Sequence, residues 1–107
     1  MTASPIPDSP GAARLDARVT GRVHGVGFRY FVFREAQALD LVGWVANVPD
    51  GSVQCVAEGP RDRLEALLDL LREGPPAAIV EGVSVAWMPA SGTFHAFGVR
   101  SGAHRGD

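Results

Sequence analysis

The sequence predicts an α+β fold in which two helices pack on one face of a mostly antiparallel sheet. Three observations predict it: two stretches with apolar residues at helical spacing, short β-prone runs around them, and Gly- and Pro-containing turns between the runs. The chain has 107 residues, 46% of them hydrophobic, which suits one domain with a single modest core. We expect that domain over residues 15–100, after a disordered, proline-containing leader over 1–14 and before a flexible tail over 101–107.

The first half of the domain is expected to contain a strand, a helix and a hairpin. In the first strand, apolar residues fall on alternate positions, at Leu15, Ala17, Val19 and Val23. The helix covers about 28–40, and its apolar stripe recurs at spacings of four, four and three, at Phe28, Val32, Ala36 and Leu39. The runs 43–47 and 52–57 form a hairpin around Val48-Pro49-Asp50-Gly51, where Pro presets φ and Gly supplies a positive φ.

The second half adds another helix and two strands. Gly59-Pro60 opens the helix and Gly74-Pro75-Pro76 ends it, with leucines along one face at Leu64, Leu67, Leu68 and Leu71. A fourth strand is marked by alternating apolar residues at Val83, Val85 and Trp87, and a short extra strand by Phe97 and Val99. The order βαββαβ plus a short extra strand is that of the ferredoxin-like α/β sandwich.

Composition and charge exclude several classes of protein. The formal charge is −2 and all ten basic residues are Arg, so we expect neither a broad basic surface nor a nucleic-acid partner. No run approaches the roughly 20 apolar residues of a membrane span, so we expect no membrane partner. The single cysteine, Cys55, cannot form an internal disulfide. We expect a cytoplasmic monomer.

A glycine-rich loop between the first strand and the first helix carries the main functional signal. Gly25 and Gly27 allow a tight curl in which backbone N–H groups converge, and the following helix N-terminus adds unpaired donors. Arg29, in the first turn of the helix, adds a permanently charged fork that suits phosphate oxygens. Tyr30 stands where a dinucleotide fingerprint needs Gly, and no Gly-Lys-Ser/Thr exists for a nucleotide P-loop. The predicted anion-binding loop is therefore His24, Gly25, Val26, Gly27, Phe28 and Arg29.

This loop and the hairpin together resemble the paired signature of the acylphosphatase family. The matching runs are Gly21 to Arg29, Gly43-Trp44-Val45-Ala46-Asn47 and Asp50-Gly51-Ser52-Val53, and the likeness covers about residues 15–100. The resemblance implies metal-free hydrolysis of an acyl phosphate to a carboxylate and inorganic phosphate, with no cofactor. It implies that Arg29 binds the phosphate, or a sulfate in its place, and that Asn47 orients the attacking water. The chain departs from the family at His24, where Gln is frequent, and at Ala46, where Arg is frequent.

Two other functions remain open at this point. One is a non-catalytic phosphate-binding accessory domain, similar to the acylphosphatase-like segment of larger carbamoyl-transfer proteins. The other is an RNA-binding module of similar topology, which the acidic charge and the helical phase of the aromatics after Gly27 disfavour. A metal site is not expected, because His24, His95 and His104 lack a ligand spacing. Cys55, Trp44 and Trp87 are expected to be core residues.

Overall fold

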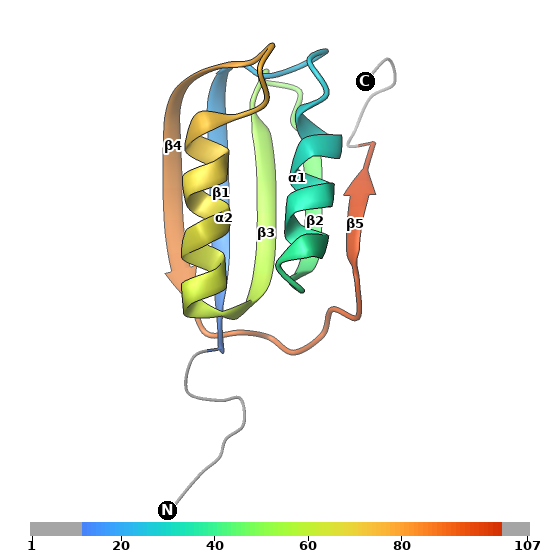
Figure 1. Ribbon diagram of the computed structural model, residues 1–107, viewed down its shortest axis with the longest axis vertical. Helices are drawn as coiled ribbons and strands as arrows, with labels where there is room; N and C mark the ends of the chain where they lie inside the picture. The colour runs from blue at the N-terminus through green and yellow to red at the C-terminus, as the bar shows by residue number, and fades with distance from the viewer. Residues whose placement is uncertain (1–11, 102–107) are drawn as a thin grey trace, which may run out of the picture.

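A computed structural model describes residues 12–101, which form a five-stranded sheet with two helices (Figure 1). The strands lie in the order β4-β1-β3-β2-β5, and all neighbours pair antiparallel except β2 and β5. The predicted ferredoxin-like βαββαβ order with an extra strand is confirmed. The elements are β1 (Ala12–Arg22), α1 (Phe28–Ala38), β2 (Val42–Asn47), β3 (Val53–Pro60), α2 (Arg61–Glu73), β4 (Ile79–Met88) and β5 (Phe97–Arg100).

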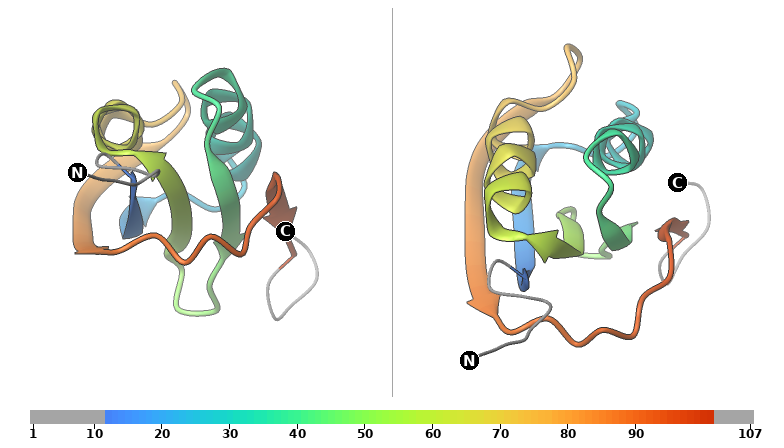
Figure 2. Two further views of the ribbon diagram at one scale, coloured as in Figure 1. Left: turned by 90° about the horizontal axis from the view of Figure 1, so that it is seen from below. Right: turned by 60° about the horizontal axis from the view of Figure 1, so that its bottom comes forward.

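Both helices cover the same face of the sheet, and the core lies between the two layers (Figure 2). Because side chains alternate along a strand, β1 and β3 each send every second residue toward the helices. α1 and α2 close the core with the apolar stripes that the sequence predicts. The helix residues buried there are Phe28, Val32 and Ala36 from α1, and Leu64, Leu67, Leu68 and Leu71 from α2.

The structure corrects three details of the sequence-based expectation. β1 begins at Ala12, three residues before the predicted start at Leu15, because backbone pairing with β3 continues beyond the apolar alternation, to Ala12 opposite Pro60. Second, α1 ends at Ala38 instead of near residue 40, and Asp40 takes a positive φ of 57° at the turn into β2. Most of the predicted leader and tail, residues 1–11 and 102–107, lies outside the described residues.

The third correction concerns Trp44, which we expected in the core. The pleat of β2 turns Val45 toward the helices and therefore turns Trp44 to the helix-free face. There its half-buried ring lies under the Arg100 guanidinium, 4.3 Å from the ring centroid. Trp87 does pack against the core, and Arg61 covers its outer side at 3.6 Å from the ring centroid.

Glu58 anchors the linker from β4 to β5, which crosses from one edge strand to the other at one end of the sheet (Figure 1). Its carboxylate is 3% exposed and accepts hydrogen bonds from the backbone N–H groups of Ser91, at 2.8 Å, and Gly92, at 3.0 Å. Arg14 adds an ion pair at 3.5 Å. These contacts hold the linker against β3 and so help to place β5 beside β2.

We predict that Glu58→Gln lowers the free energy of unfolding at neutral pH by about 2 kcal/mol, because charge-assisted hydrogen bonds are lost. Burial by itself raises the pKa of the Glu58 carboxyl, but the Ser91 and Gly92 hydrogen bonds and the Arg14 charge outweigh it, and the pKa lies below its usual value. A lowered folded-state pKa stabilises the fold above the unfolded-state pKa, and that stability is lost as pH falls through the folded-state pKa.

Urea unfolding of the wild type and the variant, from about pH 7 to about pH 2, tests this prediction. The difference in unfolding free energy between the two proteins should shrink as the pH falls. Glu65→Gln is the matched control, because Glu65 makes an exposed ion pair with Arg61 one helical turn away. A difference that stays constant over the whole pH range would show that the Glu58 charge does not stabilise the fold.

Candidate functional site

The loop between β1 and α1 has the backbone conformation that the glycines suggest. Gly25 and Gly27 have φ values of 71° and 78°, a region that other residues rarely adopt. A Cβ atom built on either glycine would meet no other atom within 4 Å, so the backbone conformation and not crowding requires glycine here. Gly27 is also the N-cap of α1, where no side chain caps the helix and no acidic residue occupies the first turn. The first N–H groups of α1 thus have no capping side chain.

The two predicted catalytic residues line one cavity of about 360 Å³ together with this loop. Arg29 enters it from the first turn of α1, and Asn47 from the end of β2, 18 positions along the chain. The β1–α1 loop, the β2–β3 turn and the end of β5 all lie at the same end of the sheet (Figure 1). The complete lining is Val23, Gly25, Gly27, Phe28, Arg29, Tyr30, Asn47 and Val99.

Arg29 is held in place by the last residue of β5. Its Nη1 atom donates a hydrogen bond to the Arg100 carbonyl oxygen at 2.9 Å, which joins two segments 71 positions apart. A cation in the first turn of a helix faces the positive end of the helix dipole, which costs a few tenths of a kcal/mol. An anion bound there would be attracted both to the guanidinium and to the helix N-terminus, which would offset this cost. The position of Arg29 therefore favours a site for a negatively charged ligand.

Asn47 is the last residue of β2 and is only 5% exposed. It shares the helix-facing phase of β2 with Val45, so its side chain lies on the same side of the sheet as α1. The tight turn that follows fixes the strand end: Gly51 N–H donates to the Val48 carbonyl at 2.9 Å, and Val48 N–H donates to the Ser52 carbonyl at 2.8 Å. The amide of Asn47 is therefore carried by a strand end next to a hydrogen-bonded turn.

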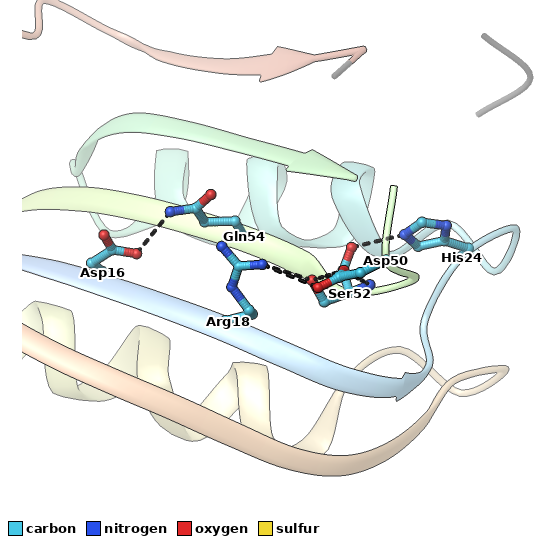
Figure 3. Close-up of polar contacts among 6 residues, drawn as sticks. All are labelled: Asp16, Arg18, His24, Asp50, Ser52 and Gln54. Carbon is cyan, nitrogen blue, oxygen red and sulfur yellow. Dashed lines mark hydrogen bonds and ion pairs between the residues drawn. The ribbon is translucent and has the colours of Figure 1, made fainter. Parts of the chain in front are cut away.

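Two residues of the predicted binding loop, His24 and Val26, do not line the cavity. Val26 packs against the core instead. The His24 ring lies against the β2–β3 turn, with Nε2 2.8 Å from the Ser52 carbonyl oxygen (Figure 3). Because a carbonyl can only accept, Nε2 carries the proton in this contact. The side chain of His24 thus ties the glycine loop to the hairpin that carries Asn47.

A polar network extends this tie to β1 (Figure 3). Asp50 accepts hydrogen bonds from both the N–H group and the hydroxyl of Ser52, at 2.9 and 2.6 Å. Arg18 of β1 pairs with Asp50 at 3.3 Å. The Ser52 hydrogen bonds and, to a lesser extent, the Arg18 charge hold the pKa of the Asp50 carboxyl below its usual value. His24, Ser52, Asp50 and Arg18 therefore connect the loop, the turn and β1.

We predict that His24→Ala lowers kcat/KM for the acyl phosphate that the family resemblance implies by about fivefold, and the free energy of unfolding by about 1 kcal/mol, because one hydrogen bond between loop and hairpin is lost. His24→Gln should recover most of the activity, since its side-chain amide can donate to the same carbonyl. His95→Ala, at an exposed position in the linker to β5, is the matched control. Steady-state kinetics that show equal losses in the Ala and Gln variants would contradict the role given to this hydrogen bond.

Three further expectations concern metal binding, the role of Cys55 and membrane spans, and residues 12–101 bear on each of them. Within that part of the chain no three His, Cys, Asp or Glu side chains come together in a way that could hold a metal ion. Cys55 is fully buried, and burial raises the pKa of its thiol to about 12, which suits a core residue and not a nucleophile. Over the described residues, the helices are all too short or too polar to cross a membrane.

Sequence reasoning missed three residues of the cavity, Val23, Tyr30 and Val99, and had placed Val23 only on the first strand. Tyr30 follows Arg29 directly, and its exposed position on the outer side of an amphipathic helix was a usable signal. Nothing in the sequence placed Val99 near the loop, because the two segments meet only through the parallel pairing of β5 with β2.

Comparison with known proteins gives consistent matches. A family model described as Acylphosphatase matches residues 15–99. A protein named Acylphosphatase from Salinibacter ruber is 54% identical over 87 residues, which are 81% of this chain and 92% of that protein. The crystal structure of acylphosphatase from Bacillus subtilis is similar with a TM-score of 0.80 and 39% identity, over 82% of this chain and 98% of that one. Full-length HypF in its phosphate- and nucleotide-bound form is similar with a TM-score of 0.79 and 26% identity, but over only 13% of its own chain.

Proposed function

Because this chain belongs to the acylphosphatase family, we propose that its glycine loop and Arg29 bind the phosphate group of the substrate while Asn47 positions the attacking water. The protein is an acylphosphatase: its substrate is a small acyl phosphate, and its products are a carboxylate and inorganic phosphate. The matches that cover almost the whole of the other protein are acylphosphatases, which favours an enzyme over an accessory phosphate-binding domain or an RNA-binding module.

Binding begins with the charge on the phosphate group. The Arg29 guanidinium and the N–H groups at the start of α1 neutralise the non-bridging oxygens, and they do so more strongly as charge builds up on them in the transition state. The hydrogen bond from Nη1 to the Arg100 carbonyl helps to orient the guanidinium. The single observation that carries this proposal is that Arg29, Asn47 and both loop glycines line one cavity.

The chemical step is the attack of water on phosphorus. The Asn47 amide holds a water in line with the bond to the leaving carboxylate, so that the new O–P bond forms as the P–O bond to the acyl group breaks. A neutral amide cannot act as a base, so the proton of the water passes to an oxygen of the substrate phosphate. A carboxylate is a good leaving group, so the step requires no covalent intermediate, metal ion or cofactor.

Hydrolysis of benzoyl phosphate by the purified 107-residue protein, in the presence of a metal chelator, tests the proposal. We expect turnover that inorganic phosphate or sulfate inhibits competitively. In water labelled with heavy oxygen, the label should appear in the phosphate product and not in benzoate. Label in benzoate would mean attack on the carbonyl carbon and would overturn the role given to Asn47. Phosphate binding without turnover would support an accessory domain instead.

We further propose that the enzyme acts as a monomer in the cytoplasm. Arg29, Asn47 and the loop glycines, to which we give the binding and catalytic roles, line one cavity of a single chain, so one copy can supply all of them. Cys55 is a free, buried thiol, which is consistent with a reducing compartment. Light scattering coupled to gel filtration should give the mass of one chain at assay concentration, and a dimer mass would contradict the proposal.

A further inference from the structure

Two exposed apolar side chains stand beside the proposed phosphate site without a role in it. Tyr30 is 62% exposed and Val99 is 46% exposed, and both line the cavity that holds Arg29 and Asn47. Among residues 12–101, the large hydrophobic side chains that are exposed are Tyr30, Ile79, Met88 and Val99, so half of this group is gathered at one cavity. Single exposed hydrophobic residues are ordinary, but two from distant segments at the same cavity indicate a binding surface.

The Tyr30 ring lies against two other side chains of α1. It stacks on Phe33, with ring centroids 6.3 Å apart and an angle of 26° between the planes. The Arg34 guanidinium lies 5.7 Å from the centroid of the same ring. These partners are three and four positions along α1, the spacing at which helix side chains meet. The ring is thus oriented before any ligand arrives, which reduces the entropy lost when one binds.

Val99 approaches the cavity from β5, the strand at the edge of the sheet. Val99 lies opposite Val45 in the parallel pairing of β5 with β2, and Phe97, two residues earlier on the same face, is buried in the core. The contact between Arg29 and the Arg100 carbonyl fixes the end of this strand against α1. Tyr30 and Val99 are therefore presented by two elements that the Arg29 hydrogen bond joins.

The volume and lining of the cavity leave space for more than a phosphate group. Its 360 Å³ lies in the ordinary range of small-molecule sites. The groups that suit a phosphate, namely the loop glycines with their amides, Arg29 and Asn47, make up part of its lining. Because the acyl group of the substrate is bonded directly to the phosphate, it must lie beside that part of the cavity.

We propose that Tyr30 and Val99 form an acyl subsite that favours acyl phosphates with an aromatic or branched apolar acyl group over acetyl phosphate. This proposal rests on the proposed function, since it requires the phosphate to bind at Arg29. An apolar acyl group that covers the Tyr30 ring and the Val99 methyl groups removes apolar surface from water on both sides, whereas an acetyl group has less apolar surface to bury.

The test compares benzoyl phosphate with acetyl phosphate in the wild type, Tyr30→Ala, Val99→Ala and the double variant. We expect the ratio of kcat/KM for benzoyl phosphate to that for acetyl phosphate to fall about fivefold in each single variant, mainly through KM of benzoyl phosphate. Tyr30→Phe should keep the wild-type ratio, because it keeps the ring. Ile79→Ala and Met88→Ala, exposed apolar positions outside the cavity lining, are the matched controls.

The outcomes separate this proposal from the one on which it rests. An unchanged ratio in the double variant, or the same change in Ile79→Ala, would overturn the acyl subsite while leaving the phosphate site intact. Inhibition by inorganic phosphate should be the same in Tyr30→Ala as in the wild type. If phosphate inhibition weakened as much as kcat/KM for benzoyl phosphate fell, Tyr30 would act on the phosphate and the acyl subsite would be overturned. Failure of the proposed function is recognised differently, by an Arg29→Ala variant that hydrolyses both substrates normally.

Discussion

Arg29→Ala is expected to lower kcat/KM for benzoyl phosphate by about 10³-fold or more, the range seen when a charge-stabilising group is removed from an acyl- or phosphoryl-transfer site. The loss should appear in both KM and kcat, because the guanidinium contacts the phosphate before and during the reaction. Competitive inhibition by inorganic phosphate should disappear as well. Arg29→Lys keeps the charge but not the planar fork, so its activity should lie between those of the wild type and the Ala variant.

The fold of the Arg29→Ala variant should be nearly unchanged. The variant loses the hydrogen bond to the Arg100 carbonyl but also removes a cation from the positive end of α1, so we expect the free energy of unfolding to change by less than about 1 kcal/mol. Arg72→Ala is the matched control, because Arg72 is an exposed arginine on α2 that pairs with Asp69. If Arg29→Ala retained more than about a tenth of the wild-type kcat/KM, Arg29 could not be the phosphate-binding group.

Asn47→Ala is expected to lower kcat by about 10²- to 10³-fold, because the water is no longer held in line with phosphorus. Phosphate inhibition should stay within about twofold of the wild-type value, since the amide acts on the water and not on the bound anion. Asn47→Asp should lose activity too, and its negative charge should weaken phosphate binding. Steady-state kinetics with benzoyl phosphate and inorganic phosphate measure both effects.

Gln54→Ala provides the control for removal of an amide from this sheet. Gln54 lies on the neighbouring strand β3, and its side chain donates to Asp16 at 3.1 Å on the helix-free face (Figure 3). Thermal melts should show that the Asn47 variants are folded at the assay temperature, because Asn47 is buried. A parallel loss of kcat and phosphate affinity in Asn47→Ala would mean that Asn47 binds the anion and does not position water.

Local patterns in the sequence were sufficient to predict the order of the elements. The apolar stripe from Phe28 to Ala36 and the leucines of α2 predicted both helices, because apolar residues at a 3.6-residue period identify the buried face of a helix. Pro49 and Gly51 marked the hairpin turn, because Pro presets φ and Gly allows a positive φ. Gly25 and Gly27 marked the loop, because glycine readily adopts the positive φ that other residues avoid.

Contacts between distant segments could not be predicted in the same way. The hydrogen bond from Arg29 to the Arg100 carbonyl depends on the parallel pairing of β5 with β2, and a run of four residues carries no signal for its partner. β1 starts early, at Ala12, because its backbone hydrogen-bonds to β3 there, and the alternation of apolar side chains gives no information about backbone hydrogen bonds. Trp44 points to the helix-free face because its neighbour Val45 points to the helices, and the sequence did not show which of the two apolar residues faces the core.

The most direct test of the account is a crystal structure of the protein grown or soaked with inorganic phosphate. We expect one phosphate in the cavity, within hydrogen-bonding distance of the loop N–H groups and the Arg29 guanidinium, with the Asn47 amide beside it and room for a water between them. A phosphate bound elsewhere, or an Asn47 side chain that faces away from the anion bound at Arg29, would contradict it.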